Sequence, residues 1–201
     1  IGYELYCRLL DEEIREQKLL SQGGEGPDHA DAAEGLSMLS QNGTEFVVDV
    51  DYDSYIPAAY IPDESARMAA YRRIGAIGSL EDYSDFQDEM TDRYGDAPAE
   101  VLILSGISLI RTMGPKIGFV KASIRSAGVR LYLNPRLQID LKALGALMND
   151  PLYGARCHIN ATGSEPYMSF KPTSMSQSKT IDEIVGLLKI MTANKSSETV
   201  A

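Results

Sequence analysis

The sequence between Pro98 and Met113 is apolar on almost every side of the helix that it predicts. Charged residues enter only near the ends of this helix, at Glu100 and Arg111. A helix without a polar face lies at the centre of a core or in a membrane. Its most apolar run, residues 101–110, is about half of the ~20 residues that span a bilayer. We therefore expect a soluble protein that does not enter membranes, with this helix at the centre of its core.

The period of the sequence changes from 3.6 to 2 after this helix. Apolar and polar residues alternate in residues 120–125 and again in residues 129–133, with a turn before Val129. Residues 156–160 and 167–171 alternate in the same way around a short polar turn. Such pairs of alternating runs predict two β-hairpins.

Further helices and loops are predicted around the hairpins. Gly114-Pro115-Lys116 is expected to be a loop, and Thr180 with Glu183 to form the capping box of a last helix. Residues 139–148 are predicted as a short helix whose apolar side consists of Leu141, Leu144, Leu147 and Met148. Helices that come first and hairpins that come later predict an α+β fold, with helices packed on a small sheet that contains two β-hairpins.

The stretch from Asp49 to Gly95 combines extended and helical patterns. A first strand is predicted over residues 46–51, and a repeated Tyr-Ile-Pro holds Ile56 and Ile61 in an extended strap. Asp63 is expected to cap a helix that runs to about Ile77.

A charged helix is predicted from Leu80 to Tyr94, between an N-cap at Ser79 and an end at Gly95. Its apolar side chains fall on one arc, which is expected to pack inward. The opposite arc carries Asp82, Asp85, Glu89, Asp92 and Arg93. Without further information, solvent is the simplest partner for this outer face.

Composition divides the chain into four parts. Residues 1–20 are predicted to be a helix and residues 21–45 a flexible linker that lacks aromatic residues. Residues 46–194 are expected to be the main domain, and residues 195–201 a polar tail. The start at Ile1, within a predicted helix, suggests a piece of a longer protein.

The overall charge favours protein partners. Nineteen basic against 29 acidic residues give a net charge of −10, which disfavours non-specific attraction to DNA and to membranes. Cys7 and Cys157 lack the spacing of a disulfide framework or a zinc cluster, so we expect two buried apolar residues in a reducing cytosol.

Motifs for enzyme chemistry are few. The sequence lacks a phosphate-binding Gly-x-x-x-x-Gly-Lys-Ser/Thr loop, and His158 is expected to have a structural or surface role. Asp49, Asp51 and Asp53 share one side of an extended chain and leave a metal-dependent phosphohydrolase open as an alternative. A solvated strand edge is the simpler explanation of these carboxylates.

A second alternative is a DNA-binding domain. Basic residues gather on and around the first hairpin, at Lys116, Lys121, Arg125, Arg130 and Arg136. Only Phe119 and Tyr132 are aromatic residues interleaved with them, so a nucleic-acid platform has little support and we expect little direct DNA binding.

Several motifs in a fixed order resemble one family. They are Tyr55-Ile56-Pro57, Tyr60-Ile61-Pro62-Asp63-Glu64, Tyr71-Arg72-Arg73-Ile74 and Asp92-Arg93-Tyr94-Gly95, with Gly2-Tyr3-Glu4-Leu5-Tyr6 nearer the start. On these residues the chain resembles the C-terminal domain of the bacterial transcription-repair coupling factors.

The resemblance implies a cytoplasmic bacterial protein whose full length is a DNA-dependent ATPase. Such a protein displaces stalled RNA polymerase with a motor that uses ATP and magnesium, and it recruits UvrA for nucleotide excision repair through a UvrB-like N-terminal module. The resemblance implies that the C-terminal domain itself is not an enzyme and binds no cofactor. It docks on the UvrB-like module and hides the UvrA-binding surface. The family's docking pattern, Glu-x-x-Asp-Arg, falls on Glu89, Asp92 and Arg93, with Asp85 on the same face.

Overall fold

The computed structural model describes residues 46–52, 54–125, 128–134, 140–163 and 165–194. The predicted helix of residues 1–20, the linker of residues 21–45 and the tail of residues 195–201 lie outside the described residues, as does Cys7. The elements in chain order are β1 (Val47–Val50), α3 (Glu64–Gly75), α4 (Leu80–Tyr94), α5 (Ala99–Ile117), β2 (Phe119–Arg125), β3 (Gly128–Leu133), α6 (Leu141–Asn149), the 3-10 turn η2 (Gly154–Arg156), β4 (Cys157–Asn160), β5 (Tyr167–Phe170) and α7 (Gln177–Ala193).

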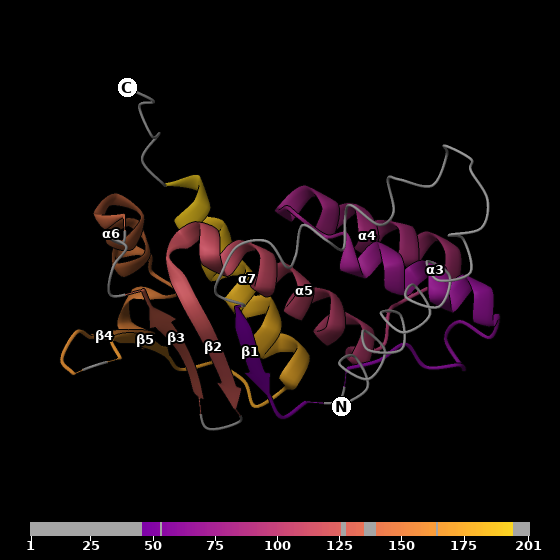
Figure 1. The fold of residues 1–201 in the computed structure, drawn as a ribbon, viewed down its shortest axis with the longest axis horizontal. Coiled ribbons are helices and arrows are strands. Elements are labelled where there is room, and N and C mark those ends of the chain that lie inside the picture. Colours follow the sequence, from indigo (N-terminus) through magenta and orange to yellow (C-terminus); the bar gives the residue numbers. More distant parts are fainter. Residues whose placement is uncertain (1–45, 53, 126–127, 135–139, 164, 195–201) are drawn as a thin grey trace, which may run out of the picture.

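Both predicted hairpins form, and they join in one mixed sheet. The strand order is β1-β2-β3-β5-β4, in which β1 runs parallel to β2 and the other neighbours are antiparallel. Helices α5 and α7 lie side by side against the sheet, while α3 and α4 lie at the opposite end of the molecule from β4 and β5 (Figure 1). The predicted α+β fold is confirmed.

Helix α5 is the centre of the core, as its apolar sequence predicts. Ile103, Leu104, Leu109 and Ile110 are almost completely buried, on different sides of the helix. Ser108 is also buried, and its hydroxyl donates to the Ile74 carbonyl 2.7 Å away, which joins α5 to α3. The sheet, α7 and α3 therefore all pack around this one helix.

The predicted loop at Gly114-Pro115-Lys116 is wrong, because α5 continues to Ile117 with Pro115 inside it. Proline removes one amide donor and crowds the preceding turn, but Pro115 is exposed in the last turn of α5, whose earlier turns are held in the core. Glycine is required at Gly114, where a Cβ atom would lie 2.5 Å from the Phe46 ring. The helix ends at Gly118, whose φ of 105° is left-handed and whose amide donates to the Gly114 and Pro115 carbonyls.

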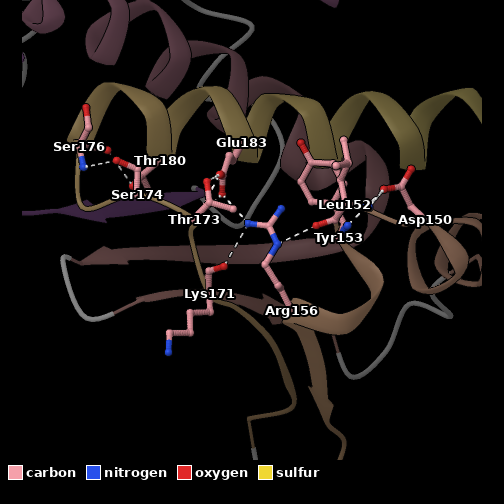
Figure 2. Close-up of polar contacts among 10 residues, drawn as sticks. All are labelled: Asp150, Leu152, Tyr153, Arg156, Lys171, Thr173, Ser174, Ser176, Thr180 and Glu183. Carbon is pink, nitrogen blue, oxygen red and sulfur yellow. Dashed lines mark hydrogen bonds and ion pairs between the residues drawn. The ribbon is translucent and has the colours of Figure 1, made fainter.

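The predicted capping box of the last helix is also wrong. Helix α7 begins one turn earlier, at Gln177, and buried Thr180 donates its hydroxyl to the Ser176 carbonyl 3.0 Å away. Glu183 instead pairs with Arg156 at 2.9 Å (Figure 2). The spacing of Thr180 and Glu183 predicts a cap, but Glu183 forms a long-range ion pair instead.

The predicted apolar side of the short helix α6 is right for Leu144 and Leu147, which pack on the core, and wrong for Leu141 and Met148. Leu141 is 80% exposed and Met148 is 38% exposed, whereas Ala143 and Leu147 are buried. The helix contacts its neighbour α7 along this narrower line of residues four apart. Asp140, whose carboxylate accepts from the amides of the first turn, fixes where the helix begins.

The strap, α3 and α4 follow the sequence closely. Ile56 and Ile61 are buried, and the Ile56 amide donates to the Tyr71 hydroxyl at 2.9 Å. The Asp63 carboxylate accepts from the Ala66 amide at 2.7 Å, as an N-cap does.

Cys157 of β4 is buried, as predicted. No helix in the described ranges is long and apolar enough to cross a bilayer.

Candidate functional site

The candidate site is the outer face of α4, which both of its ends hold in place. The Ser79 hydroxyl accepts from the Asp82 amide at 3.1 Å, and Asp82 accepts from the same hydroxyl at 2.9 Å and from the Gly78 amide at 3.0 Å. These hydrogen bonds, that from Ser79 first, lower the pKa of the Asp82 carboxyl. Asp82 therefore belongs to the cap of the helix, although its exposure matched that of the other outer residues.

The inner face of α4 fixes its rotation. Tyr83, Phe86 and Met90 are buried, and Gln87 donates its amide to the Tyr83 hydroxyl at 2.7 Å. At the far end, the Tyr60 hydroxyl of the strap donates to the carbonyls of Met90 in α4 and of Gly95, its C-cap. The rings of Tyr60 and Tyr94 pack edge to face, with their centres 5.8 Å apart. Because the helix is fixed on this side, its opposite side presents a defined set of charges.

Glu89 and Arg93 form an ion-pair network on this outer face. The Glu89 carboxylate accepts from Arg93 at 2.9 Å and lies 3.3 Å from Arg73 of α3. Arg93 in turn lies 5.1 Å from the centre of the Tyr94 ring. Glu89 is thus engaged within the chain, so its first role is to hold α3 and α4 together and to orient Arg93.

A shallow hollow lies beside this network, between α3 and α4. It is lined by alanines of α3, by Met90 of α4 and by the charged residues Arg73, Glu89 and Arg93. Its volume is about 30 Å³, room for about two water molecules. The hollow alone therefore does not define a ligand site.

The remaining charges of the face are carboxylates. Asp85, Asp88 and Asp92 are exposed, and within the described part of the chain they make no side-chain hydrogen bond or ion pair. Residues 79–100, counted with both ends, contain eight acidic residues and one basic residue, Arg93. Asp88 was not among the predicted site residues, although its position one turn from both Asp85 and Asp92 places it on the same face.

The alternative metal site is occupied by an arginine. Arg125 donates to the Asp49 carboxylate at 2.5 Å and lies 3.9 Å from the Asp51 carboxylate. Asp53 lies outside the described residues, and elsewhere in the chain no described group of three His, Cys, Asp or Glu side chains has a metal-binding arrangement. The guanidinium between these two carboxylates supplies the positive charge that a metal ion would otherwise provide.

The basic residues of the first hairpin do not form a single stripe. Lys116 donates to the Gly78 carbonyl at 2.8 Å and so ties α5 to the start of α4, while Arg125 pairs with Asp49. Lys121 and Arg130 remain on the strands, and Arg136 lies outside the described residues. Phe119, one of the two aromatic residues expected among them, is buried.

The observed fold defines the chain as an α+β domain with a mixed sheet and a projecting pair of charged helices. A crystal structure of the C-terminal domain of a transcription-repair coupling factor has the same fold, with a TM-score of 0.55, 19% sequence identity, and coverage of 76% of this chain and 97% of that one.

Sequence comparisons agree with the structural comparison. Residues 50–144 match the family model of the TRCF domain. The transcription-repair-coupling factor of Bacillus subtilis (strain 168) is 27% identical over 191 residues, covering 94% of this chain and 15% of that protein. That of Staphylococcus haemolyticus (strain JCSC1435) is 24% identical over 180 residues, covering 84% of this chain and 14% of the protein.

The family model, the curated relatives and the solved structure thus agree, and this chain is similar to the TRCF domain, the C-terminal domain of the transcription-repair coupling factors. It spans about 15% of the length of the curated relatives that it matches.

Proposed function

We propose that this domain is a regulatory, non-catalytic module that docks through the outer face of α4 on a UvrB-like module of the same protein. The docked domain covers the surface that UvrA binds. The observation that carries this proposal is the row formed by Asp85, Asp88 and Asp92, exposed carboxylates without a described partner on a helix that is fixed from behind. Like charges three and four residues apart repel one another. A partner surface with arginines would relieve this repulsion.

Each residue of the face has a proposed role. Asp85 and Asp92 accept hydrogen bonds from arginines of the UvrB-like module, and Arg93 offers its guanidinium fork to an acceptor there. Glu89, held by Arg73 and Arg93, contributes mainly by setting the position of Arg93. The family pattern Glu-x-x-Asp-Arg supports the assignment of Glu89, Asp92 and Arg93 to one contact.

The strength of such contacts makes the docked state reversible. An exposed ion pair contributes only ~0.2–1 kcal/mol, so the docked state depends on several pairs and on the high effective concentration of a tethered domain. The chain spans about 15% of the relatives named transcription-repair coupling factor, which leaves ample length in such a protein for a motor and a UvrB-like module. Engagement of RNA polymerase by that motor is the proposed signal for release.

The test is a charge reversal of Asp85→Lys with Asp92→Lys in the full-length protein. Loss of two exposed pairs at ~0.2–1 kcal/mol each should open the docked state and raise UvrA binding by about 2- to 30-fold. Biolayer interferometry with purified UvrA measures the change. Reversal of Glu89 is less informative, because it also breaks the pairs with Arg73 and Arg93.

Glu165→Lys is the matched control, since Glu165 is exposed between β4 and β5, at the end of the molecule away from α4 (Figure 1). It makes the same change of charge and should leave UvrA binding as it was. Thermal unfolding establishes that both proteins remain folded. If the α4 variant is folded and binds UvrA no better than the parent protein, α4 is not the docking face.

A further inference from the structure

One face of the sheet carries no helix of the described part of the chain. Helices α5 and α7 pack on the other face, where alternate residues such as Ala122, Ile124, Leu131 and Met168 are buried. The side chains between them project from the opposite, open face. Several of these are aromatic, basic or amide side chains.

The strand register aligns the open-face residues in two rows across the sheet. The first row, read from β1 to β4, is Val47, Lys121, Tyr132, Tyr167 and Asn160. The second row is Asp49, Ser123, Arg130, Ser169 and His158. Each row draws on both hairpins, so neither exists until β3 pairs with β5.

Two tyrosine rings lie next to each other at the centre of the first row. Tyr132 and Tyr167 are half-buried, with ring centres 5.9 Å apart and ring planes tilted by 51°. Asn160 donates to the Tyr167 hydroxyl at 3.2 Å, which fixes the second ring. Lys121 lies 5.3 Å from the centre of the Tyr132 ring, and Arg130 lies 5.3 Å from that of Tyr167.

The cations beside these rings have no acidic partner within the described part of the chain. Lys121 and Arg130 are exposed and, among the described residues, make no ion pair, whereas Asp49 is engaged by Arg125. Residues 1–45 contain ten acidic and three basic residues, so most of the net charge of −10 does not come from the sheet. The open face therefore combines half-buried rings with positive charge that no described acidic residue pairs.

We propose that this open sheet face binds single-stranded nucleic acid without regard to sequence. Bases stack on Tyr132 and Tyr167, while Lys121 and Arg130 leave the rings and bind the flanking phosphates. An acidic peptide would use the cations but would have no use for the paired rings. A flat surface of five strands also cannot enter the groove of a duplex, which admits a helix or a two-stranded ribbon.

The aromatic residues of the open face come from both hairpins, and not from the first hairpin alone. Only Phe119 and Tyr132 were available as platform aromatics there, and Phe119 is buried. The second ring comes from Tyr167, on the other hairpin, and register places it directly opposite Tyr132. The contacts involve base faces and phosphates, so DNA and RNA strands should bind alike.

The experiment measures fluorescence anisotropy of labelled oligothymidylate and oligouridylate with the whole 201-residue chain at low salt. Tyr132→Leu with Tyr167→Leu keeps apolar bulk but removes the rings, and binding should fall at least about fivefold. Lys121→Ala with Arg130→Ala should also weaken binding. For two phosphate contacts, a plot of the logarithm of the binding constant against the logarithm of the salt concentration should have a slope of about −1.4.

Matched controls separate the face from general effects of charge and of stability. Lys179→Ala with Lys189→Ala removes two exposed cations of α7 and should leave binding unchanged. Tyr132→Phe with Tyr167→Phe keeps both rings and should retain binding. The substituted residues belong to the sheet and to α7, and none of them lies in α4. A failure to bind single-stranded nucleic acid would therefore leave the docking proposal intact.

Two results would overturn the inference. The first is the absence of salt-sensitive binding by the folded chain. The second is binding that survives loss of both rings, or that a polyglutamate peptide abolishes equally in the parent and leucine variants, since the face would then be a site for acidic peptides.

Discussion

Arg156 is the residue with the widest range of contacts in the sheet half of the molecule. Its Nε donates to the Leu152 carbonyl at 2.7 Å, and its Nη1 donates to Glu183 at 2.9 Å and to the Lys171 carbonyl at 3.3 Å (Figure 2). Its guanidinium also lies 4.9 Å from the centre of the Phe170 ring. The Glu183 carboxylate receives further hydrogen bonds from the amide and the hydroxyl of Thr173. One arginine thus ties η2, the end of β5 and α7 together.

Arg156→Ala should lower the free energy of unfolding by about 2–3 kcal/mol, because it leaves the largely buried Glu183 carboxylate without its cation. The side chains of this pair are only 22% and 17% exposed. Arg156→Lys should cost less than alanine but still destabilise, because an ammonium group cannot reproduce the fork. Urea denaturation measures both.

Arg93→Ala is the surface comparison for Arg156. The pair of Arg93 with Glu89 spans one helical turn, and Arg93 is 54% exposed, so the expected loss is below about 0.5 kcal/mol. Equal losses at Arg156 and Arg93 would contradict the assignment of Arg156 as the connecting residue of the sheet half.

At the scale of elements, the tightest contact is the crossing of α5 and α7. A Cβ atom at Gly106 would lie 2.1 Å from Ile181 Cγ2. Gly106→Ala should therefore destabilise the domain by about 1–3 kcal/mol through overpacking. Combining Gly106→Ala with Ile181→Ala should cost less stability than the sum of the two single changes, since the methyl groups no longer collide. Differential scanning calorimetry of the single and double variants measures these losses of stability.

Gly145→Ala is the matched control in α6, where no atom lies within 4 Å of the added Cβ. Here the same substitution should stabilise the domain by about 0.5–1 kcal/mol, because alanine restricts the unfolded chain and favours the helix. A stabilising Gly106→Ala would show that α5 and α7 are not in close contact at this point.

Local signals in the sequence predict those elements whose ends and faces they encode. Ser79 and Gly95 mark α4, and its buried residues follow the predicted arc. Leu141 shows the limit, since apolar composition cannot say which side of a short helix meets a neighbour. Glu183 and Tyr167 were not predicted as an ion-pair partner and a platform ring, because pairings between distant segments define both roles. The outer charges of α4 were predictable from periodicity, whereas the pairing of Glu89 with Arg73 of α3 was not.

At the scale of the whole molecule, charge is segregated. Acidic side chains concentrate on α4, and unpaired Lys121 and Arg130 lie on the open sheet face, with α4 at the opposite end of the molecule from β4 and β5 (Figure 1). A net charge of −10 suggests uniform repulsion of polyanions. The observed arrangement instead allows one domain to present an acidic docking face and a basic sheet face at the same time.

Stability of the whole domain should fall as the pH rises from about 9 to about 12. Burial raises the pKa of the Cys157 thiol from 9.0 to about 11. Burial, with Asp182 nearby, raises the pKa of Tyr83 from 10.0 to about 12. Both groups keep their protons longer in the folded state than in the unfolded state, so the unfolded state binds fewer protons over this range and is favoured by rising pH.

Each of these two groups should contribute a loss on the order of 2 kcal/mol once the pH exceeds its folded-state pKa. Urea denaturation across this pH range measures how steeply the free energy of unfolding falls with pH. Tyr83→Phe cannot ionise, so it should flatten the fall above about pH 10 even though Gln87 loses its hydrogen-bond partner. Cys157→Ala should flatten the fall that begins near pH 9. A fall of the same slope in the double variant would assign alkaline unfolding to other groups, among which Tyr52, Tyr60 and Tyr153 also have a pKa raised chiefly by burial.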